Sequence, residues 1–542
     1  MPLGQRKKNR IGPPPESPKE APHSPPKAPT LSLAGSRATP GTALIAPHSR
    51  RPRVGEVVTV QAVDLDEQGA GRGLVDGLAL HVPGLLPGES GKVLISHISP
   101  HHPQAWATLQ ERLSQSPDRQ IPICAGYGVC GGCTLQHLSY PAQLRWKRAR
   151  LRATLGELLG QPDSDEFLRS CVGSPGHEGP GSVPEYRSRI KLIAASEPGS
   201  GQLVLGSYLP RTHAVVPMAQ CRVHAEGLTA TIERLQQELR RAGLLPYQED
   251  LRRGCLRYVL LRETTDGAQA LSLVVAELPA ESQLDGLTAA LRQACPQLGS
   301  LVLHQNRSPG NSLLSDEEGS PESSGADRIL HGQSYLWDEL GGLPLRVSAR
   351  SFLQVNRATA ARIYSDVACE LAQLASRIRR QGPLRILDVY CGVGGLGLTV
   401  LSRLPGSQLF GLEWSESAIA DAQAAAERMG MSAQTCFLAG AAEVRLAEPA
   451  LRNQLNPLAF VLLNPPRRGC TEPVLAAVLA LRPLHIAYVS CSPESLARDL
   501  RILTAAGYGL RHCTPYDMHP GTPHIESVTL LHDRRSPAYQ DN

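Results

Sequence analysis

The chain has 542 residues, of which 41% are hydrophobic and 19% are charged. This length exceeds what one hydrophobic core organises, so we expect two or three domains. No apolar run reaches the roughly 18 residues that a membrane helix needs, and we expect a soluble, cytoplasmic protein without a membrane partner. The thirteen cysteines, with no secretory signal, indicate a reducing compartment rather than a disulfide framework.

The net charge of +5 is concentrated at the start of the chain. Residues 1–53 are rich in proline and contain ten Lys and Arg residues against two acidic ones. A charged, Pro-rich segment has too few apolar residues to form a core, so we expect a disordered basic tail over 1–53. Such a tail either holds phosphates without sequence preference or only solvates the protein.

Residues 54–113 read as short strands separated by turns. The apolar runs VVTV, ALHV and KVLI alternate with turn segments such as DEQGAGRG and PGLLPGESG. This pattern is typical of a small β-barrel. Basic residues are sparse in it, so the barrel either binds a partner through its loops or only packs against the body of the protein.

Residues 114–345 mix helical and strand patterns, which predicts an α+β central domain. The segment QLRWKRARLRATLGELLG has helical periodicity and a basic stripe, and residues 186–303 are rich in strand-like runs. Alternating Arg187, Arg189 and Lys191 suit phosphates, or form a solvated strand face. Residues 308–327 are acidic and poor in apolar side chains, so we expect a disordered loop there.

From residue 346 onward strands and helices alternate, as in a doubly wound α/β domain with a mostly parallel sheet. The stretch LRILDVYCGVGGLGL (384–398) is an apolar strand that runs into a glycine-rich turn and a helix, which lets a ligand approach the backbone. The next strand ends in Glu413, where a carboxylate suits ribose hydroxyls, and its spacing from Asp388 favours a nucleoside ligand.

Three cysteines are clustered in CAGYGVCGGC, and a fourth lies downstream in MAQCRVH. They are Cys124, Cys130, Cys133 and Cys221. Three closely spaced thiols and a distant fourth suit an iron–sulfur cluster or a zinc site, because both take four thiolates from turns. Zinc sites more often pair their ligands as C-x2-C units.

Five motifs in a fixed order give the chain a family resemblance. They are DVYCGVGGLGL, SFLQVN (351–356), LNPPRRG (463–469), YVSCSPESLARD (488–499) and HIESVTLL (524–531). Together they resemble the RNA uracil-C5 methyltransferase family, over nearly all of residues 54–532. The resemblance implies a TRAM β-barrel (54–113), a central iron–sulfur and RNA-binding domain (114–345) and a Rossmann-like S-adenosylmethionine-dependent methyltransferase domain (346–542). It also implies a 4Fe–4S cluster on the four cysteines named above.

The chemistry of this family requires a nucleophile, because C5 of uracil attacks a sulfonium methyl group too weakly by itself. A thiolate that adds to C6 converts the base to an enolate, and a base must then remove the C5 proton. The resemblance makes Cys491 the nucleophile and Glu526 the general base, with His524 completing the family's H-x-E pattern. The target uridine would be flipped out of its stack before attack.

The predicted cofactor site has five residues. Gln354 and Tyr390 match positions that contact the cofactor in the family, and the turn and strand ends supply Gly392, Glu413 and Asn464. We therefore expect S-adenosylmethionine to bind at the carboxyl end of the predicted parallel sheet.

Two residues depart from the family pattern. Asn464 stands where the family usually has an aspartate, and Ala441 stands where it usually has a polar contact to adenine. An amide both donates and accepts hydrogen bonds, so Asn464 changes base recognition or rate without removing the site. Phe352 either stacks on a base or is buried. Because the nucleophile and the base are both present, we expect an active enzyme.

The resemblance also indicates a class of substrate. Family members that combine a TRAM domain with a cluster mostly act on 23S rRNA, which favours rRNA over tRNA. The alternatives are a tRNA uracil-C5 methyltransferase and a catalytically weak RNA-binding assembly factor. DNA cytosine methylation typically places its cysteine after proline, whereas Cys491 follows Ser490. We expect a monomer.

Overall fold

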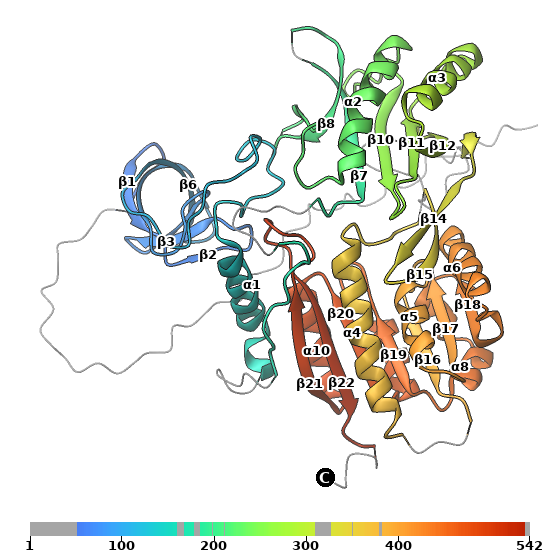
Figure 1. Ribbon diagram of the computed structural model, residues 1–542. Helices are drawn as coiled ribbons and strands as arrows, with labels where there is room; N and C mark the ends of the chain where they lie inside the picture. Colours follow the sequence, from blue (N-terminus) through green and yellow to red (C-terminus); the bar gives the residue numbers. More distant parts are fainter. Residues whose placement is uncertain are drawn as a thin grey trace, which may run out of the picture. The chain divides into compact units, whose positions relative to one another are not determined.

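The computed structural model describes residues 51–159, 167–177, 185–197, 199–210, 212–308, 327–349, 351–378 and 382–536 (Figure 1). Residues 51–542 group as one compact unit. The predicted basic tail and acidic loop fall almost entirely outside the described residues. Within the described part of the chain, no helix is both long and apolar enough to cross a membrane. In the described residues, three large sheets and one two-stranded hairpin follow one another along the compact unit.

The first sheet has six strands in the order β1-β5-β6-β4-β3-β2. They are β1 (Val57–Gln61), β2 (Asp64–Leu65), β3 (Gly71–Val75), β4 (Leu78–Val82), β5 (Ser90–Ile98) and β6 (Gln104–Arg112). The sheet curls back on itself, so that β1 lies close to β3 although the two strands are not neighbours in the strand order. Gly73 permits this approach, since a Cβ there would lie 2.3 Å from the Gln61 carbonyl oxygen. The strands predicted from VVTV, ALHV and KVLI are confirmed.

The second sheet has seven strands in the order β13-β12-β11-β10-β7-β8-β9. Its elements, after α1 (Tyr140–Leu155) and the short η1 (Gly156–Leu159), are β7 (Arg189–Ser196), β8 (Leu203–Tyr208), β9 (Val215–Pro217), α2 (Glu226–Arg241), β10 (Leu256–Glu263), β11 (Gln269–Val275), α3 (Glu281–Ala294), β12 (Leu298–Gln305) and β13 (Arg328–Gly332). Leucines of α2 and α3 share one buried cluster with the sheet. The predicted helix at α1 is confirmed, and the α+β character of this region is confirmed by α2 and α3.

A hairpin, β14 (Tyr335–Leu340) and β15 (Leu343–Ser348), leads into the third sheet. The elements that follow are α4 (Arg357–Ala375), β16 (Arg385–Val389), α5 (Gly395–Arg403), β17 (Gln408–Glu413), α6 (Glu416–Arg428), η2 (Ser432–Gln434), β18 (Thr435–Ala439), α7 (Ala442–Arg445), α8 (Pro449–Leu455), β19 (Phe460–Leu463), α9 (Glu472–Leu481), β20 (His485–Ser490), α10 (Pro493–Ala505), β21 (Tyr508–Tyr516) and β22 (Glu526–Asp533). The strand order is β18-β17-β16-β19-β20-β22-β21.

The third sheet is doubly wound, as the sequence predicted. Its first five strands are parallel, and β22 runs antiparallel to both β20 and β21. Alternate residues of β16 enter different buried clusters: Ile386 packs with α4 and α5, and Leu387 packs with α9 and α10. Helices therefore cover both faces. The strand order reverses between β16 and β19, and ligands of such sheets bind in the crevice beyond this point.

Candidate active site

The turn after β16 has an unusual backbone. Tyr390, Gly392 and Gly394 have φ angles of +66°, +54° and +80°. Tyr390 is a non-glycine residue in the left-handed region, a conformation that costs energy and clusters at functional sites. A Cβ placed on Gly392 would meet nothing closer than the Phe352 carbonyl oxygen at 3.8 Å. The turn therefore presents open backbone at the switch point of the sheet.

Two carboxylates fix this turn. The Glu413 side chain accepts the N–H groups of Gly392 and Ser415, both at 3.1 Å. Asp388 is buried, and its Oδ2 accepts the Gly397 N–H at 3.0 Å. Its Oδ1 is buried with no hydrogen-bond partner among the described residues, and burial raises the pKa of Asp388 to about 8. An open turn with an unpaired buried oxygen fits a polar ligand such as the nucleoside part of a cofactor.

The predicted SFLQVN segment is held from two sides. Asp421, which is fully buried on α6, accepts the Ser348 N–H at 2.9 Å and the Ser351 hydroxyl. From the second sheet, the Ser188 N–H and hydroxyl both donate to the Val355 carbonyl, at 2.9 and 3.0 Å. The segment is thus fixed by contacts from α6 on one side and from the residue directly before β7 on the other.

This segment carries two of the predicted site residues. Phe352 is 58% exposed, so of its two alternatives the buried one is wrong and the stacking one remains a prediction. Gln354 is half-buried. The Arg189 guanidinium donates to the Ser351 and Ala349 carbonyls, both at 3.4 Å, rather than lying on a solvated face. The solvated-face alternative is therefore wrong for Arg189, because its guanidinium contacts the segment that follows β15.

The predicted nucleophile and base lie on neighbouring strand ends. Cys491 directly follows β20, and Glu526 begins β22. The antiparallel register pairs Ser490 with Ser527, so the next pair in the same register is Cys491 with Glu526. Directly opposed residues of an antiparallel pair have Cα atoms about 5 Å apart and side chains on one face. Two residues that are 35 positions apart in the sequence therefore meet at one sheet edge.

The electrostatics of the pair follow from burial. Glu526 is 4% exposed, and burial raises its pKa to about 8. Cys491 is half-buried, and burial together with the Glu526 charge raises the pKa of its thiol to about 11. The Arg467 guanidinium opposes both shifts. Arg467 was not predicted as a site residue, although it belongs to the LNPPRRG motif that the sequence singled out.

The loop that carries Arg467 is clamped by α10. The Ser495 hydroxyl donates to the Arg467 carbonyl at 3.0 Å. Asp499 is fully buried and accepts the Cys470 N–H at 2.8 Å and the Tyr488 hydroxyl at 2.6 Å. These contacts position the backbone of the loop, and they join β20, α10 and the loop into one unit behind Cys491.

The two residues that depart from the family pattern lie at the same edge. Asn464 is half-buried directly after β19, and its N–H lies 3.4 Å from the Val389 carbonyl of β16. Ala441 is half-buried next to Gly440, whose N–H donates to the Glu413 carbonyl at 2.9 Å. Both positions therefore border the predicted cofactor crevice.

The cysteine segment is only partly assembled. Burial raises the pKa of the Cys133 thiol to about 11, and the charges of Cys221 and Cys130 add to the shift, so these three thiols lie within electrostatic range of one another. Across the described residues, however, no group of three or more His, Cys, Asp or Glu side chains is close enough to hold a metal ion. Gly131 packs so closely against the Pro210 ring that a Cβ on this glycine would lie 2.2 Å from the proline side chain.

The cysteine segment also contacts the loop that precedes Glu526. The Leu135 N–H donates to the Gly521 carbonyl at 2.8 Å, and the Gly521 N–H donates to the Gln143 side chain at 3.0 Å. Lys147 of α1 and Asp517 form an ion pair in which both side chains are fully buried. The predicted basic stripe of α1 is therefore wrong at Lys147, because this lysine is used to attach α1 to the third sheet.

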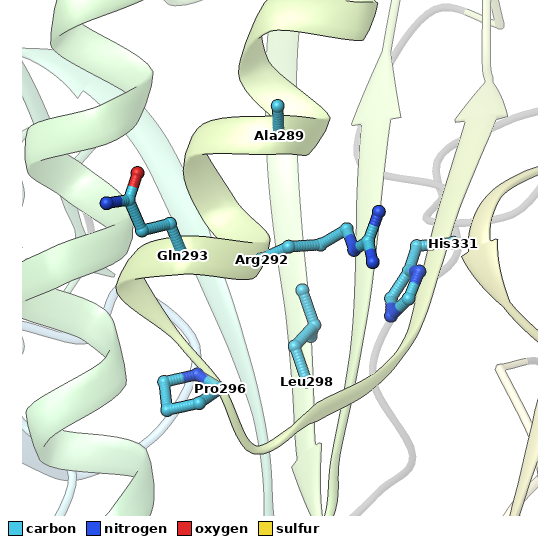
Figure 2. A pocket seen from close by; sticks show the side chains of 6 residues that line it. All are labelled: Ala289, Arg292, Gln293, Pro296, Leu298 and His331. Atoms are coloured by element: carbon cyan, nitrogen blue, oxygen red, sulfur yellow. The ribbon is translucent and has the colours of Figure 1, made fainter.

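A pocket lies elsewhere, between α3, β12 and β13. Figure 2 shows Arg292 and His331 pointing toward one another above Leu298, with Gln293 and Pro296 beside them. None of the predicted site residues lines this pocket. The catalytic prediction therefore depends on the strand ends of the third sheet, not on this pocket.

Comparisons with known proteins indicate the family of this chain. The family described as tRNA (uracil-5-)-methyltransferase matches residues 326–534. An RNA methyltransferase of Halalkalibacterium halodurans is 32% identical over 88% of this chain and 97% of its own length. Relatives from Listeria monocytogenes (32% identity, 86% of this chain, 96% of the relative) and Geobacter sulfurreducens (32%, 91% and 93%) are also RNA methyltransferases.

A solved structure shares the fold. It is the tRNA (uracil-54, C5)-methyltransferase of Pyrococcus abyssi in complex with S-adenosyl-L-homocysteine, with a TM-score of 0.64 and 24% identity, covering 88% of this chain and all of that one. The fold is that of an S-adenosylmethionine-dependent methyltransferase. The chain belongs to the RNA uracil-C5 methyltransferase family and is an enzyme.

Proposed function

We propose that this enzyme methylates C5 of a uridine in 23S rRNA, with Cys491 as the nucleophile and Glu526 as the general base. The observation that supports the proposal is the register of β20 and β22, in which Ser490 opposes Ser527, so that the adjoining Cys491 and Glu526 belong to the same sheet edge. A thiol beside a buried carboxylate, with Arg467 close to both, provides the groups that the reaction needs.

The chain's residues act in sequence. The Cys491 sulfur forms a bond to C6 of the flipped uracil, and the electrons of the C5–C6 double bond move to O4 as an enolate. S-adenosylmethionine supplies the methyl group that C5 takes up. Glu526 then removes the C5 proton, and the electrons of the C5–H bond restore the double bond and expel the Cys491 thiolate. Arg467 favours the thiolate form of Cys491, because it lowers the pKa of that thiol.

The proposed cofactor contacts are Gln354, Tyr390, Gly392, Glu413 and Asn464. Glu413 holds the Gly392 N–H in place, and both lie at the switch point of the sheet. The unpaired Oδ1 of Asp388 and the open space at Gly392 support a polar ligand there. Phe352, exposed beside this turn, is proposed to stack on the flipped base.

We further propose that residues 54–113 are a TRAM barrel and that Cys124, Cys130, Cys133 and Cys221 hold a 4Fe–4S cluster. The curled six-stranded sheet supports the barrel, and the Cys-x5-Cys-x2-Cys spacing with a distant fourth cysteine supports the cluster. Iron and sulfide analysis of protein purified without oxygen tests the cluster. Four irons per chain are expected, and zinc at one per chain would contradict the assignment.

The experiment that tests the reaction uses RNA that contains 5-fluorouridine. Fluorine at C5 is not removed as a proton is, so a working enzyme stalls as a covalent complex that survives denaturation. We expect this complex with 23S rRNA transcripts in the presence of S-adenosylmethionine, and no complex with Cys491→Ala. Cys436→Ala, which changes another half-buried cysteine on β18, is the matched control and should be trapped like wild type.

A tRNA substrate is the second candidate function. It is favoured by the name of the matching family and by the activity named for the Pyrococcus abyssi structure. Parallel trapping with fluorinated tRNA decides between the two. A complex with tRNA alone would overturn the rRNA assignment and leave the catalytic pair intact. Absence of a complex with either RNA, while the protein binds S-adenosyl-L-homocysteine, would favour an RNA-binding assembly factor.

A further inference from the structure

The outer face of the first sheet carries four residues in one row. The strand registers pair Arg72 with His81, His81 with Trp106, and Trp106 with His97, across β3, β4, β6 and β5. Residues paired in this way point to the same side of a sheet. The neighbours Leu80, Val82, Ala105 and Ala107 are buried in the core of this sheet, so the row faces outward.

Three members of the row carry rings in mutual contact, and we call His81, Trp106 and His97 the ring row. The His81 and Trp106 ring centroids are 5.6 Å apart with an interplanar angle of 21°, and those of His97 and Trp106 are 5.4 Å apart at 36°. His97 is exposed and Trp106 is half-buried. One end of the ring row is therefore open to another flat group.

Neighbouring contacts hold the ring row in place. The His81 Nδ1 atom lies 2.7 Å from the Asp66 carboxylate, which fixes the orientation of that ring. The Ser96 hydroxyl donates to the Trp106 carbonyl at 2.8 Å, next to His97 on β5. A ring that is fixed before a ligand arrives loses little conformational entropy on binding.

The turn between β5 and β6 adds two more imidazoles at the same end. His101 and His102 are exposed, and their N–H groups lie 3.3 and 3.2 Å from the Ser99 hydroxyl. The histidines do not form a metal site in the part of the chain that the structure describes, because no group of three or more ligating side chains comes together there. Flat rings and hydrogen-bonding imidazoles without a metal are instead suited to a nucleobase and its phosphate.

We propose that the ring row is a stacking site for an unpaired nucleotide of the RNA that this enzyme methylates, separate from the catalytic crevice. The proposal rests on an RNA substrate, as proposed above. Bases stack on aromatic rings without sequence preference, so the site would anchor the RNA while the catalytic edge selects the uridine. The ring row contains no Lys or Arg residue. Its contribution to RNA affinity would therefore be distinguished from that of phosphate contacts by its weak dependence on salt.

The test is the binding of a 23S rRNA transcript and of an unstructured oligouridine to the full chain, without S-adenosylmethionine. Loss of one stacked base predicts about a 10-fold rise in the Kd for Trp106→Ala, with an unchanged dependence on salt. Trp106→Tyr keeps a ring and should bind within about twofold of wild type. Base stacking should also quench tryptophan emission more in wild type than in Trp106→Tyr.

Two further variants keep the test informative. His97→Ala changes an exposed residue that the fold does not need, and it should weaken binding even if Trp106→Ala misfolds. Leu74→Ala removes a 70%-exposed side chain from the same sheet and should leave the Kd unchanged. Equal binding by wild type, Trp106→Ala and His97→Ala would overturn the proposal and would favour a protein partner for this face. Trp106-dependent binding without any methylation would instead overturn only the proposed function.

Discussion

The catalytic edge and the cysteine segment are assembled in different ways. Cys491 and Glu526 are brought together by the register of two strands whose side chains are largely buried, so their relative position needs no ligand. The cysteines lie on turns outside regular elements, and the thiols of Cys130, Cys133 and Cys221 lie within electrostatic range of one another. A sheet edge is preorganised by its backbone, whereas a turn-borne ligand set usually closes when the metal binds.

The largest expected effect is at the preorganised edge. Glu526→Gln keeps the size of the side chain and removes the proton acceptor, so turnover should fall about 10³-fold, as for the loss of a general base. The covalent complex should still form, because Cys491 is intact, and it should accumulate even on RNA without fluorine. Denaturing gels and initial rates measure the two effects. Normal turnover would assign the proton to another group.

The second effect concerns pH and the same carboxyl group. The folded chain holds a proton on Glu526 up to about pH 8, whereas the unfolded chain releases it near 4.5. Because the folded state binds more protons in this window, stability falls as pH rises from 4.5 to 8. Glu526→Gln is neutral throughout, so it should be more stable than wild type at pH 8.5 by roughly 5 kcal/mol, because the rise in pKa from 4.5 to about 8 is worth about 1.4 kcal/mol per pKa unit.

Denaturant unfolding at pH 4.5 and pH 8.5 measures this difference, which should nearly disappear at the lower pH. A constant difference at both pH values would show that the carboxyl titrates normally. Whereas the stability of wild type falls as the pH rises, its methylation rate should increase up to about pH 8, because only the ionised Glu526 accepts a proton.

A smaller effect is expected behind the catalytic pair. Asp499→Asn replaces one acceptor oxygen of a buried carboxylate by a donor, which disturbs the clamp on the loop of Arg467. Loss of one such buried hydrogen bond costs about 1–3 kcal/mol, so kcat/KM should fall about 10-fold while S-adenosyl-L-homocysteine binding is retained. Glu111→Gln, which changes an exposed ion pair, is the control. Equal kinetics for both variants would show that the clamp does not position Arg467.

The smallest effect on cofactor binding should come from the cysteine segment. Cys130→Ser should lose the proposed iron, but its Kd for S-adenosyl-L-homocysteine should stay within about twofold of wild type, because the glycine-rich turn is fixed by Glu413 and Asp388. Iron analysis measures the loss of iron, and isothermal titration calorimetry measures the Kd for S-adenosyl-L-homocysteine. Joint loss of iron and cofactor affinity would show that the two regions depend on one another, through contacts such as Leu135 with Gly521.

Much of the third sheet was predictable, because its signals are local. The apolar run into DVYCGVGGLGL predicted β16, the turn and α5, and the alternation of elements predicted a doubly wound sheet. The exposure of Phe352 was not predictable, because it depends on whether a neighbour covers the ring. The same holds for Arg189 and Lys147, whose charges suggested a solvated surface and whose partners are far away in the sequence.

The sequence by itself determined the element types, the family and the identity of the candidate nucleophile and base, because periodicity, turn residues and motifs are written in short stretches of chain. Only the tertiary structure decided that Cys491 and Glu526 lie at one sheet edge, that Arg467 lies near both, and that the ring row crosses three strands. The physical reason is that strand register and burial are set by long-range pairing and packing, which no local window of residues specifies.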